Sequence, residues 1–227
     1  MTSIKYCVPS EARRIVGAAV VIDVLRAFTT AAWLLDGGAS ELILAATDED
    51  ALALKDVRPG ALAVKDGAPA SGFDLVNSPR VVSTADVRGR PVVQRTTWGT
   101  VGAHAARHAQ LLLCASFVRA SATAACLARS AATDVTFVPT GAHGLADEDL
   151  ACAELIATLL GGSADAGPFV DRARRSEAAA SLRRGLELGH RGVHEDNIEM
   201  CLDVDRFDFA MRAVDHGTHL ELTRAPL

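Results

Sequence analysis

The stretch VGAAVVIDVLRAFTTAAWLLDGG, residues 16–38, decides the fold. Its first part, residues 16–23, is a continuous apolar run that ends in a carboxylate, which is typical of a strand buried on both faces. Residues 26–36 then have a helical pattern that stops at two glycines, Gly37 and Gly38. A buried strand followed directly by a helix is the repeating unit of an α/β protein.

The same alternation continues along the chain and predicts the fold class. Further strands are expected at 41–46, 61–64, 91–95, 110–115 and 134–139, with helices between them and a last long helix at 147–160. Helical stretches at 169–188 and near 197 follow, then short strands near 209–214 and 219–223. We therefore expect an α/β fold with three layers (α/β/α), a largely parallel sheet and a mixed α+β extension over residues 165–227.

Composition narrows the function classes. Apolar residues make up 49% of the 227 residues and the net charge is −5 without a basic stripe, so we expect a large core and no nucleic-acid partner. No apolar stretch of membrane-spanning length and no signal-peptide core is present, which predicts a cytoplasmic protein without membrane contact. We expect one domain over residues 1–227, and the sequence is compatible with a homodimer.

Polar side chains follow several predicted strands at their carboxyl ends, where α/β proteins bind ligands. Asp23 ends the first strand, and a carboxylate there needs a cation or a metal, although a helix N-cap or an ion pair with Arg26 would also satisfy it. Lys65 and Asp66 end the strand at 61–64, and Thr140, Gly141 and His143 follow the strand at 134–139. We expect these groups to meet at one edge of the sheet.

The turn at 96–100, TTWGT, follows a strand and opens a helix. Free backbone N–H groups at a helix N-terminus bind phosphate, and glycine allows a close approach, so this turn is a candidate phosphate cradle. An ordinary helix N-cap is the alternative, because threonine is common there.

The acidic triplet Asp147-Glu148-Asp149 opens the helix at 147–160. Mg²⁺ prefers such hard oxygen ligands. The alternative is that the triplet only stabilises the helix N-terminus through its dipole.

Four segments occur in an order that identifies a family: VIDVLRA at 21–27, GFDLVNSP at 72–79, TTWGT at 96–100 and EDLACA at 148–153. Together they resemble the motifs of the 2-phosphosulfolactate phosphatases and cover roughly residues 16–160. The resemblance implies a Mg²⁺-dependent phosphatase with an α/β fold, which converts phosphosulfolactate to sulfolactate. Trp98 stands where the family motif has Asn, Val76 where it has Gly, and Glu154 where it has a final Gly.

The strand ends and the resemblance together predict the site. We expect Asp23, Arg26 and Asp149 to be catalytic, and Asp23, Glu148 and Asp149 to hold Mg²⁺. Arg26 and Lys65 would pair with phosphate oxygens. The expected substrate-binding residues are Lys65, Asn77, Ser78, Thr96, Thr97, Trp98, Gly99 and Thr100.

The predicted reaction is hydrolysis of a small acidic phosphomonoester. Two cations, Arg26 and Lys65, suggest a phosphate plus a second acid group, and Trp98 offers a flat face for stacking. 2-Phosphosulfolactate, a phosphorylated sugar acid or a nucleoside-like phosphate would fit this description. The alternative is a protein that binds such a ligand without turning it over, because the Trp98 indole would block the family's pocket.

Overall fold

The apolar run at the start of the chain forms β2 (Ala18–Ile22), of which all five residues are buried. In the computed structural model, which describes residues 2–225, β2 is flanked by two parallel neighbours, β7 (Leu111–Ala115) and β8 (Asp134–Pro139). α1 (Ala27–Asp36) follows β2 after a short turn and buries eight of its ten residues. The stretch at 16–38 therefore forms the predicted buried strand and helix.

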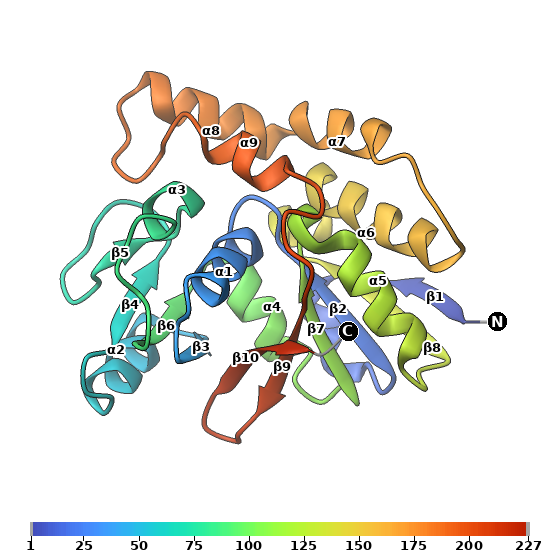
Figure 1. The fold of residues 1–227 in the computed structure, drawn as a ribbon, viewed down its shortest axis with the longest axis horizontal. Helices are drawn as coiled ribbons and strands as arrows, with labels where there is room; N and C mark the ends of the chain where they lie inside the picture. Colours follow the sequence, from blue (N-terminus) through green and yellow to red (C-terminus); the bar gives the residue numbers. More distant parts are fainter. Residues whose placement is uncertain (1, 226–227) are drawn as a thin grey trace.

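The other elements agree closely with the predicted pattern (Figure 1). The remaining strands are β1 (Ser3–Tyr6), β3 (Glu41–Ala45), β4 (Leu62–Lys65), β5 (Leu75–Val76), β6 (Pro91–Arg95), β9 (Ala210–Asp215) and β10 (Leu220–Ala225). The remaining helices are α2 (Asp48–Asp56), α3 (Pro79–Val82), α4 (Gly99–Ala105), α5 (Ala120–Arg129), α6 (Asp147–Leu160), α7 (Gly167–Arg174), α8 (Glu177–Glu187) and α9 (Asn197–Leu202). The short edge strands β1 and β5 were not predicted.

All strands belong to one sheet in the order β1-β8-β2-β7-β9-β10-β3-β6-β4-β5. The pairings within β1-β8-β2-β7 and within β3-β6-β4-β5 are parallel, which confirms the largely parallel sheet. The C-terminal hairpin β9–β10 lies between these two sets and pairs with β7 on one side and β3 on the other. The extension is therefore mixed α+β as predicted, and its hairpin completes the middle of the sheet.

The two parallel sets do not share one edge of a flat sheet, contrary to the expectation from the strand ends. Because the β7–β9, β9–β10 and β10–β3 pairings are all antiparallel, the sets run in opposite directions along the sheet. α1 and α4 lie between the sets (Figure 1), and one apolar core joins both helices to strands of both sets. The sheet thus curves around these two helices, which lets the carboxyl ends of β2, β4 and β6 approach one another.

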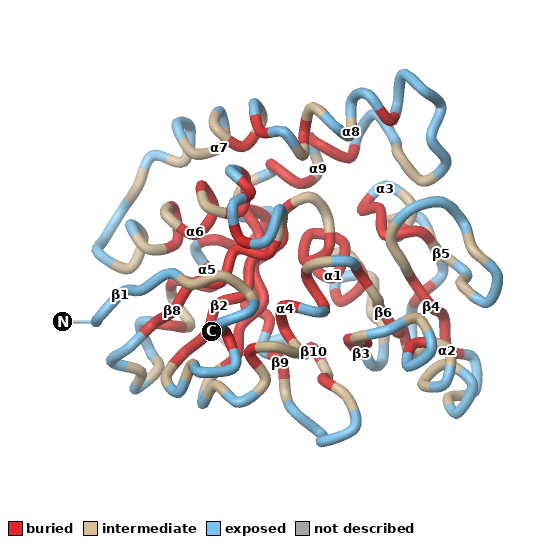
Figure 2. Tube along the Cα trace, turned by 180° about the vertical axis from the view of Figure 1, so that it is seen from behind, coloured by how far each residue is buried: buried red, intermediate tan, exposed pale blue. Residues whose placement is uncertain are grey.

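Two main cores give the molecule its layers. One face of β2 (Ala19, Val21) packs in the core with α1 and α4, and the other face (Ala18, Val20, Ile22) packs in a second core with α5 and α6. The buried residues accordingly run through the centre of the molecule in Figure 2, while α7 and α8 expose most of their outer surface. This arrangement confirms the three-layer α/β/α architecture.

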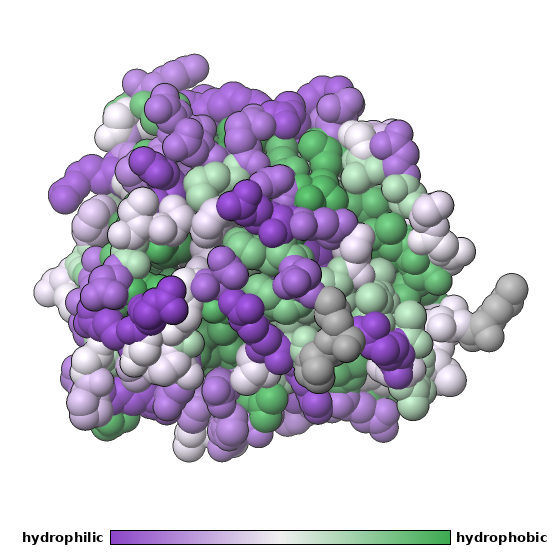
Figure 3. Space-filling view, in the orientation of Figure 1, coloured by the Kyte–Doolittle hydropathy of each residue, from purple (hydrophilic) through white to green (hydrophobic). Residues whose placement is uncertain are grey.

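The C-terminal helices α7, α8 and α9 run across the top of the molecule in Figure 1, above α1 and α6. The surface in the same view is mostly polar, with apolar areas between the charged side chains (Figure 3). None of the helices within residues 2–225 is long and apolar enough to cross a bilayer.

Candidate active site

Asp23 directly follows β2 and is buried, with 7% of its surface exposed. Its Oδ1 accepts a hydrogen bond from the backbone N–H of Ala27 (2.9 Å), so the carboxylate caps the start of α1. Gly99, the first residue of α4, lies so close that a Cβ there would be 2.8 Å from Asp23 Oδ2. The N-termini of α1 and α4 therefore both point at one carboxylate.

The environment of Asp23 changes its acidity. Burial raises the pKa of Asp23 to about 7, and the nearby carboxylates of Asp66 and Glu148 raise it further than the N–H groups of Ala27 and Gly99 lower it. A group of like charges around a buried carboxylate is costly unless a cation joins them.

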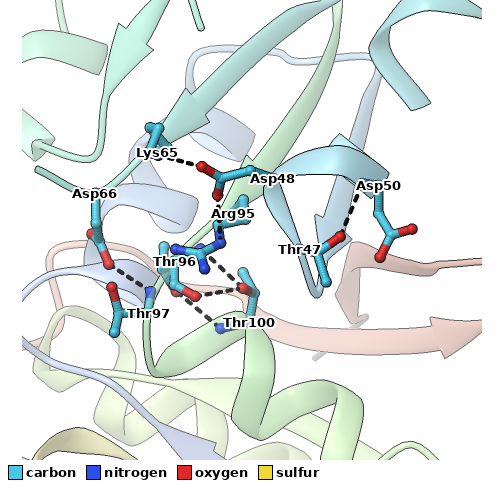
Figure 4. Close-up of polar contacts among 9 residues, drawn as sticks. All are labelled: Thr47, Asp48, Asp50, Lys65, Asp66, Arg95, Thr96, Thr97 and Thr100. Atoms are coloured by element: carbon cyan, nitrogen blue, oxygen red, sulfur yellow. Dashed lines mark hydrogen bonds and ion pairs between the residues drawn. The ribbon is translucent and has the colours of Figure 1, made fainter. Parts of the chain in front are cut away.

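The TTWGT turn uses two of its three hydroxyls internally (Figure 4). Thr96 Oγ1 accepts from the N–H of Thr100 (3.0 Å) and Thr100 Oγ1 accepts from the N–H of Thr96 (2.9 Å), and both residues are fully buried. Thr97 is exposed, and its N–H donates to Asp66 Oδ2 (2.7 Å). Among the threonines predicted to bind substrate, Thr97 is therefore the one whose hydroxyl has no hydrogen-bond partner within residues 2–225, while Thr96 and Thr100 hold the turn.

Trp98 lies half-buried beside this turn, with its ring edge-on to His143 at a centroid distance of 4.6 Å. His143 and the preceding Ala142 both have positive φ angles, 59° and 47°, in the short 3₁₀ segment Gly141–Gly144. The segment that follows β8 thus bends back to cover the indole.

Asp149 connects two strand ends. Its Oδ1 accepts from the N–H of Val24 (2.8 Å), and its Oδ2 accepts from the N–H groups of Gly141 (2.9 Å) and Thr140 (3.2 Å). Burial raises the pKa of Asp149 well above its usual value, and the neighbouring carboxylates of Asp23 and Glu148 add to this. With both oxygens bound to backbone donors, Asp149 positions the loops after β2 and β8.

Glu148 is buried like Asp149 but differs in its partners. Its Oε2 has no hydrogen-bond partner within residues 2–225, and burial raises the pKa of its carboxyl group. The residue lines a cavity of about 430 Å³ together with Leu25, Trp98, residues of the 141–147 loop and the start of α8. Glu148 is thus the buried carboxylate of the triplet that has an oxygen available to bind a ligand.

No three His, Cys, Asp or Glu side chains within the described part of the chain are grouped as a complete metal site. Asp23 and Glu148 are therefore the two predicted ligands with oxygens that backbone donors do not fully occupy. Mg²⁺ commonly needs only one or two carboxylates, because water and substrate phosphate supply its other ligands.

Lys65 is not placed as predicted for a phosphate-binding cation. It forms an ion pair with Asp48, at the start of α2, and Asp48 also pairs with Arg95 (2.8 Å; Figure 4). The Lys65 ammonium additionally lies 5.0 Å from the centre of the Phe73 ring. The Lys65 ammonium is therefore already paired with a carboxylate, that of Asp48, 17 residues earlier in the chain.

Arg26 lies at the start of α1, close to the predicted site. Its Nη1 donates to the carbonyl oxygen of Gly192 (2.8 Å), in the loop between α8 and α9. Burial lowers the pKa of Arg26, and the carboxylate of Asp66 partly offsets this effect. The C-terminal extension thus reaches the side chain that sequence analysis assigned to the phosphate.

Asn77 and Ser78 are buried, and their side chains hydrogen-bond to residues around the site. Asn77 Nδ2 donates to Asp66 Oδ1 (2.7 Å), while its Oδ1 accepts from Gln94 Nε2 (3.0 Å). Ser78 Oγ lies 2.7 Å from the amide of Asn197 in α9. The two predicted substrate-binding residues therefore hold Asp66 and α9 in place.

Asp66 was expected at the sheet edge from its place after a strand, but no role was predicted for it. It follows β4 directly, bonds to the TTWGT turn and to Asn77, and raises the pKa of Asp23. Its position at a strand end was the available signal, but none of the four family motifs includes it.

Comparison with known proteins identifies the family. The sequence profile of 2-phosphosulpholactate phosphatase matches residues 6–216. The chain belongs to this family. A probable 2-phosphosulfolactate phosphatase of Bacillus subtilis is 35% identical over 202 residues, 87% of each chain. Proteins of the same description are 43% identical over 157 residues in Thermus thermophilus (68% of this chain, 66% of the relative) and over 146 residues in Deinococcus radiodurans (63% and 61%).

Family membership confirms the resemblance and the assignment to the phosphoric monoester hydrolases. The three departures from the family motifs lie in different settings. Trp98 lines the cavity beside Glu148, Val76 is buried in β5, and Glu154 pairs with Arg172 (2.7 Å) between α6 and α7. Trp98 is therefore the departure that lies beside the buried carboxylates, whereas Val76 lines a different cavity, next to Arg191.

Proposed function

We propose that this chain is a Mg²⁺-dependent phosphatase that hydrolyses a small acidic phosphomonoester. 2-Phosphosulfolactate, which its relatives are named for, is the first candidate, and a phosphorylated sugar acid or nucleoside-like phosphate is the next. The observation that carries the proposal is the buried carboxylate of Asp23 facing the N-terminus of α4, with Glu148 and Asp66 close by.

The donor set fits Mg²⁺ in its chemistry. Glu148 Oε2 is buried without a partner among the described residues, and Asp23 carries a raised pKa in a group of carboxylates. A divalent cation would satisfy both features, and all the oxygens are hard donors of the kind that Mg²⁺ prefers. We assign Asp23 and Glu148 as its protein ligands. When bound, such an ion neutralises phosphate charge and acidifies a bound water.

The chain's own residues then have separate tasks. Asp149 holds the backbone of Val24 and Gly141, so that Asp23 and the loop after β8 keep their relative position. Asp66 fixes the TTWGT turn through Thr97, whose hydroxyl remains free for a phosphate oxygen. Arg26 supplies positive charge on the side facing the C-terminal extension. Oriented charge of this kind stabilises a phosphoryl group without costly rearrangement.

Trp98 favours a second candidate function, ligand binding without turnover. The indole forms part of the wall of the 430 Å³ cavity and is held edge-on by His143. A bulky ring beside Glu148 would exclude the family substrate from that space.

The cytoplasmic location and the homodimer stay predictions.

A panel of phosphomonoesters, assayed for phosphate release with Mg²⁺ and with a chelator, separates the two functions. We expect release of inorganic phosphate from at least one acidic ester, in Mg²⁺ only. Calorimetric binding of the same esters without any hydrolysis would instead support the binding protein.

A further inference from the structure

A second cavity is lined by Arg26, whose neighbour Leu25 lines the cavity beside Glu148, and its lining has the opposite charge. It has a volume of about 400 Å³ and is lined by Arg26, Gly67, Ala68 and residues 189–191 and 193. Three of these side chains, Arg26, His190 and Arg191, carry or can accept positive charge, and no carboxylate lines the cavity. The cavity beside Glu148, in contrast, is lined by three carboxylates and no arginine or lysine.

Arg26 is fixed at the wall of this basic cavity. Its Nη1 donates to the Gly192 carbonyl (2.8 Å), and the Asn197 amide, oriented with Nδ2 toward Ser78, offers its oxygen to the same nitrogen at 2.9 Å. This orientation of Asn197 also lets its oxygen accept from the N–H of His194 (3.0 Å). No other N–H group of the Arg26 guanidinium bonds to a residue within 2–225, so several donors remain for a ligand.

Arg191 reaches the cavity because the loop between α8 and α9 approaches the loop after β4 very closely. Gly192 has φ of 90°, and a Cβ there would be 2.8 Å from the Gly67 carbonyl oxygen. Only glycine allows this contact, which places Arg191 next to it at the cavity wall. Within the described residues Arg191 forms no ion pair, whereas Lys65 is held by Asp48.

Building on the function proposed above, we infer that this basic cavity binds the second anionic group of the substrate. Arg191, from the C-terminal extension, replaces Lys65 as the cation that recognises a carboxylate or sulfonate. Arg26 contacts both this acid group and the phosphate. An arginine fork can donate two parallel N–H groups to two oxygens of such an anion, whereas an ammonium acts as a point charge. The loop between α8 and α9 thereby determines specificity for acidic esters.

A pair of esters that differ in one acid group tests this inference. 2-Phospholactate and isopropyl phosphate differ only in a carboxylate in place of a methyl group, and 2-phosphosulfolactate adds a sulfonate. In Arg191→Met we expect KM for 2-phospholactate to rise about tenfold or more, because a charge-assisted bond is lost. For isopropyl phosphate we expect kcat/KM to stay within about twofold. A larger loss for 2-phosphosulfolactate than for 2-phospholactate would assign the sulfonate to Arg191.

The controls separate recognition from folding and from catalysis. Arg191→Lys should recover part of the lost affinity, and Arg129→Met, an equal change of charge on the exposed end of α5, should alter neither ester. Equal losses for both esters in Arg191→Met, or no loss for either, would overturn the inference. If the wild-type chain hydrolyses none of the acidic esters in the panel, including 2-phosphosulfolactate, the proposed function fails. The dissociation constant of 2-phospholactate measured by calorimetry, with and without Arg191, would then still decide whether the cavity binds the acid group.

Discussion

Gly99 lies directly against Asp23, so that a Cβ on residue 99 would be 2.8 Å from Asp23 Oδ2 and 3.1 Å from Asp23 Cβ. The same Cβ would be 2.6 Å from Ala27 Cβ. These are closer than van der Waals contact, and the neighbours are short side chains that cannot move aside. The absence of a side chain at position 99 is therefore what lets the N-terminus of α4 reach the carboxylate.

Gly99→Ala should displace α4 from Asp23. We expect kcat/KM to fall by about tenfold to a hundredfold, because small displacements of reacting groups are costly, and stability to fall by about 1–3 kcal/mol. Gly161→Ala is the control, since a Cβ there meets only the Thr158 carbonyl at 3.4 Å. Steady-state kinetics and urea unfolding of both variants check this. Wild-type kinetics in Gly99→Ala would show that the contact has no functional role.

Asp149→Asn should mainly destabilise the fold. Its two oxygens face backbone N–H groups from Val24 on one side and Gly141 on the other, so an amide would put its own NH₂ against one of them. We expect a loss of roughly 1–3 kcal/mol in urea unfolding. Asp147→Asn is the control, because Asp147 is exposed and its ion-pair partner within residues 2–225 is the surface side chain of Arg172, so its loss should be below about 1 kcal/mol. Equal losses would contradict the positioning role.

The pH dependence of stability should differ between the wild type and Asp23→Asn when a chelator is present. Burial raises the pKa of Asp23 from 3.8 to about 7, so between these values the native state keeps a proton that the unfolded state releases. The contribution of this bound proton to the free energy of unfolding is complete below pH 4 and is lost as the pH rises to 7. Relative to the wild type, Asp23→Asn should gain stability over that window, by roughly 1.4 kcal/mol per pH unit. A difference in the free energy of unfolding between the two proteins, measured with urea, that stays constant from pH 4 to pH 8 would contradict the raised pKa.

Trp98→Asn restores the residue that the family motif carries and should alter substrate preference. Removing the indole from the wall beside Glu148 and His143 opens the cavity, so we expect the ratio of kcat/KM for 2-phosphosulfolactate over phenyl phosphate to shift by about tenfold. Trp33→Phe serves as the control. Trp33 lies on α1 and packs against Phe207 of the apolar core. An unchanged ratio would mean that Trp98 has no part in selectivity.

Local pattern was sufficient for most of the elements. The run at 16–23 predicted β2, and the position of Asp23 at its end predicted a buried carboxylate, because both depend on neighbours in the sequence. The strands β9 and β10 were predicted as well. Their place between β7 and β3 was not, since it depends on pairing with strands about 100 and 175 residues earlier, for which no local pattern exists.

The site was harder to predict because its contacts are distant in sequence. Lys65 has the spacing of a phosphate-binding cation, but Asp48 neutralises it. Thr96 and Thr100 have hydroxyls suited to a phosphate, but each hydroxyl oxygen accepts a hydrogen bond from the backbone N–H of the other residue. Arg191 gave no signal, because only the contact of Gly192 with Gly67 brings it to the cavity.

Mg²⁺-dependent phosphate release by matched carboxylate variants tests the central claim most directly. Phosphate released from 2-phosphosulfolactate would be measured against Mg²⁺ concentration for the wild type, Asp23→Asn, Glu148→Gln and the control Asp134→Asn, an exposed carboxylate that pairs with Lys5. We predict saturable Mg²⁺ dependence in the wild type and in Asp134→Asn. Asp23→Asn and Glu148→Gln should fold but lose at least about a hundredfold in activity, with weaker Mg²⁺ binding by calorimetry. Folded Asp23→Asn with wild-type turnover and Mg²⁺ affinity would contradict the account.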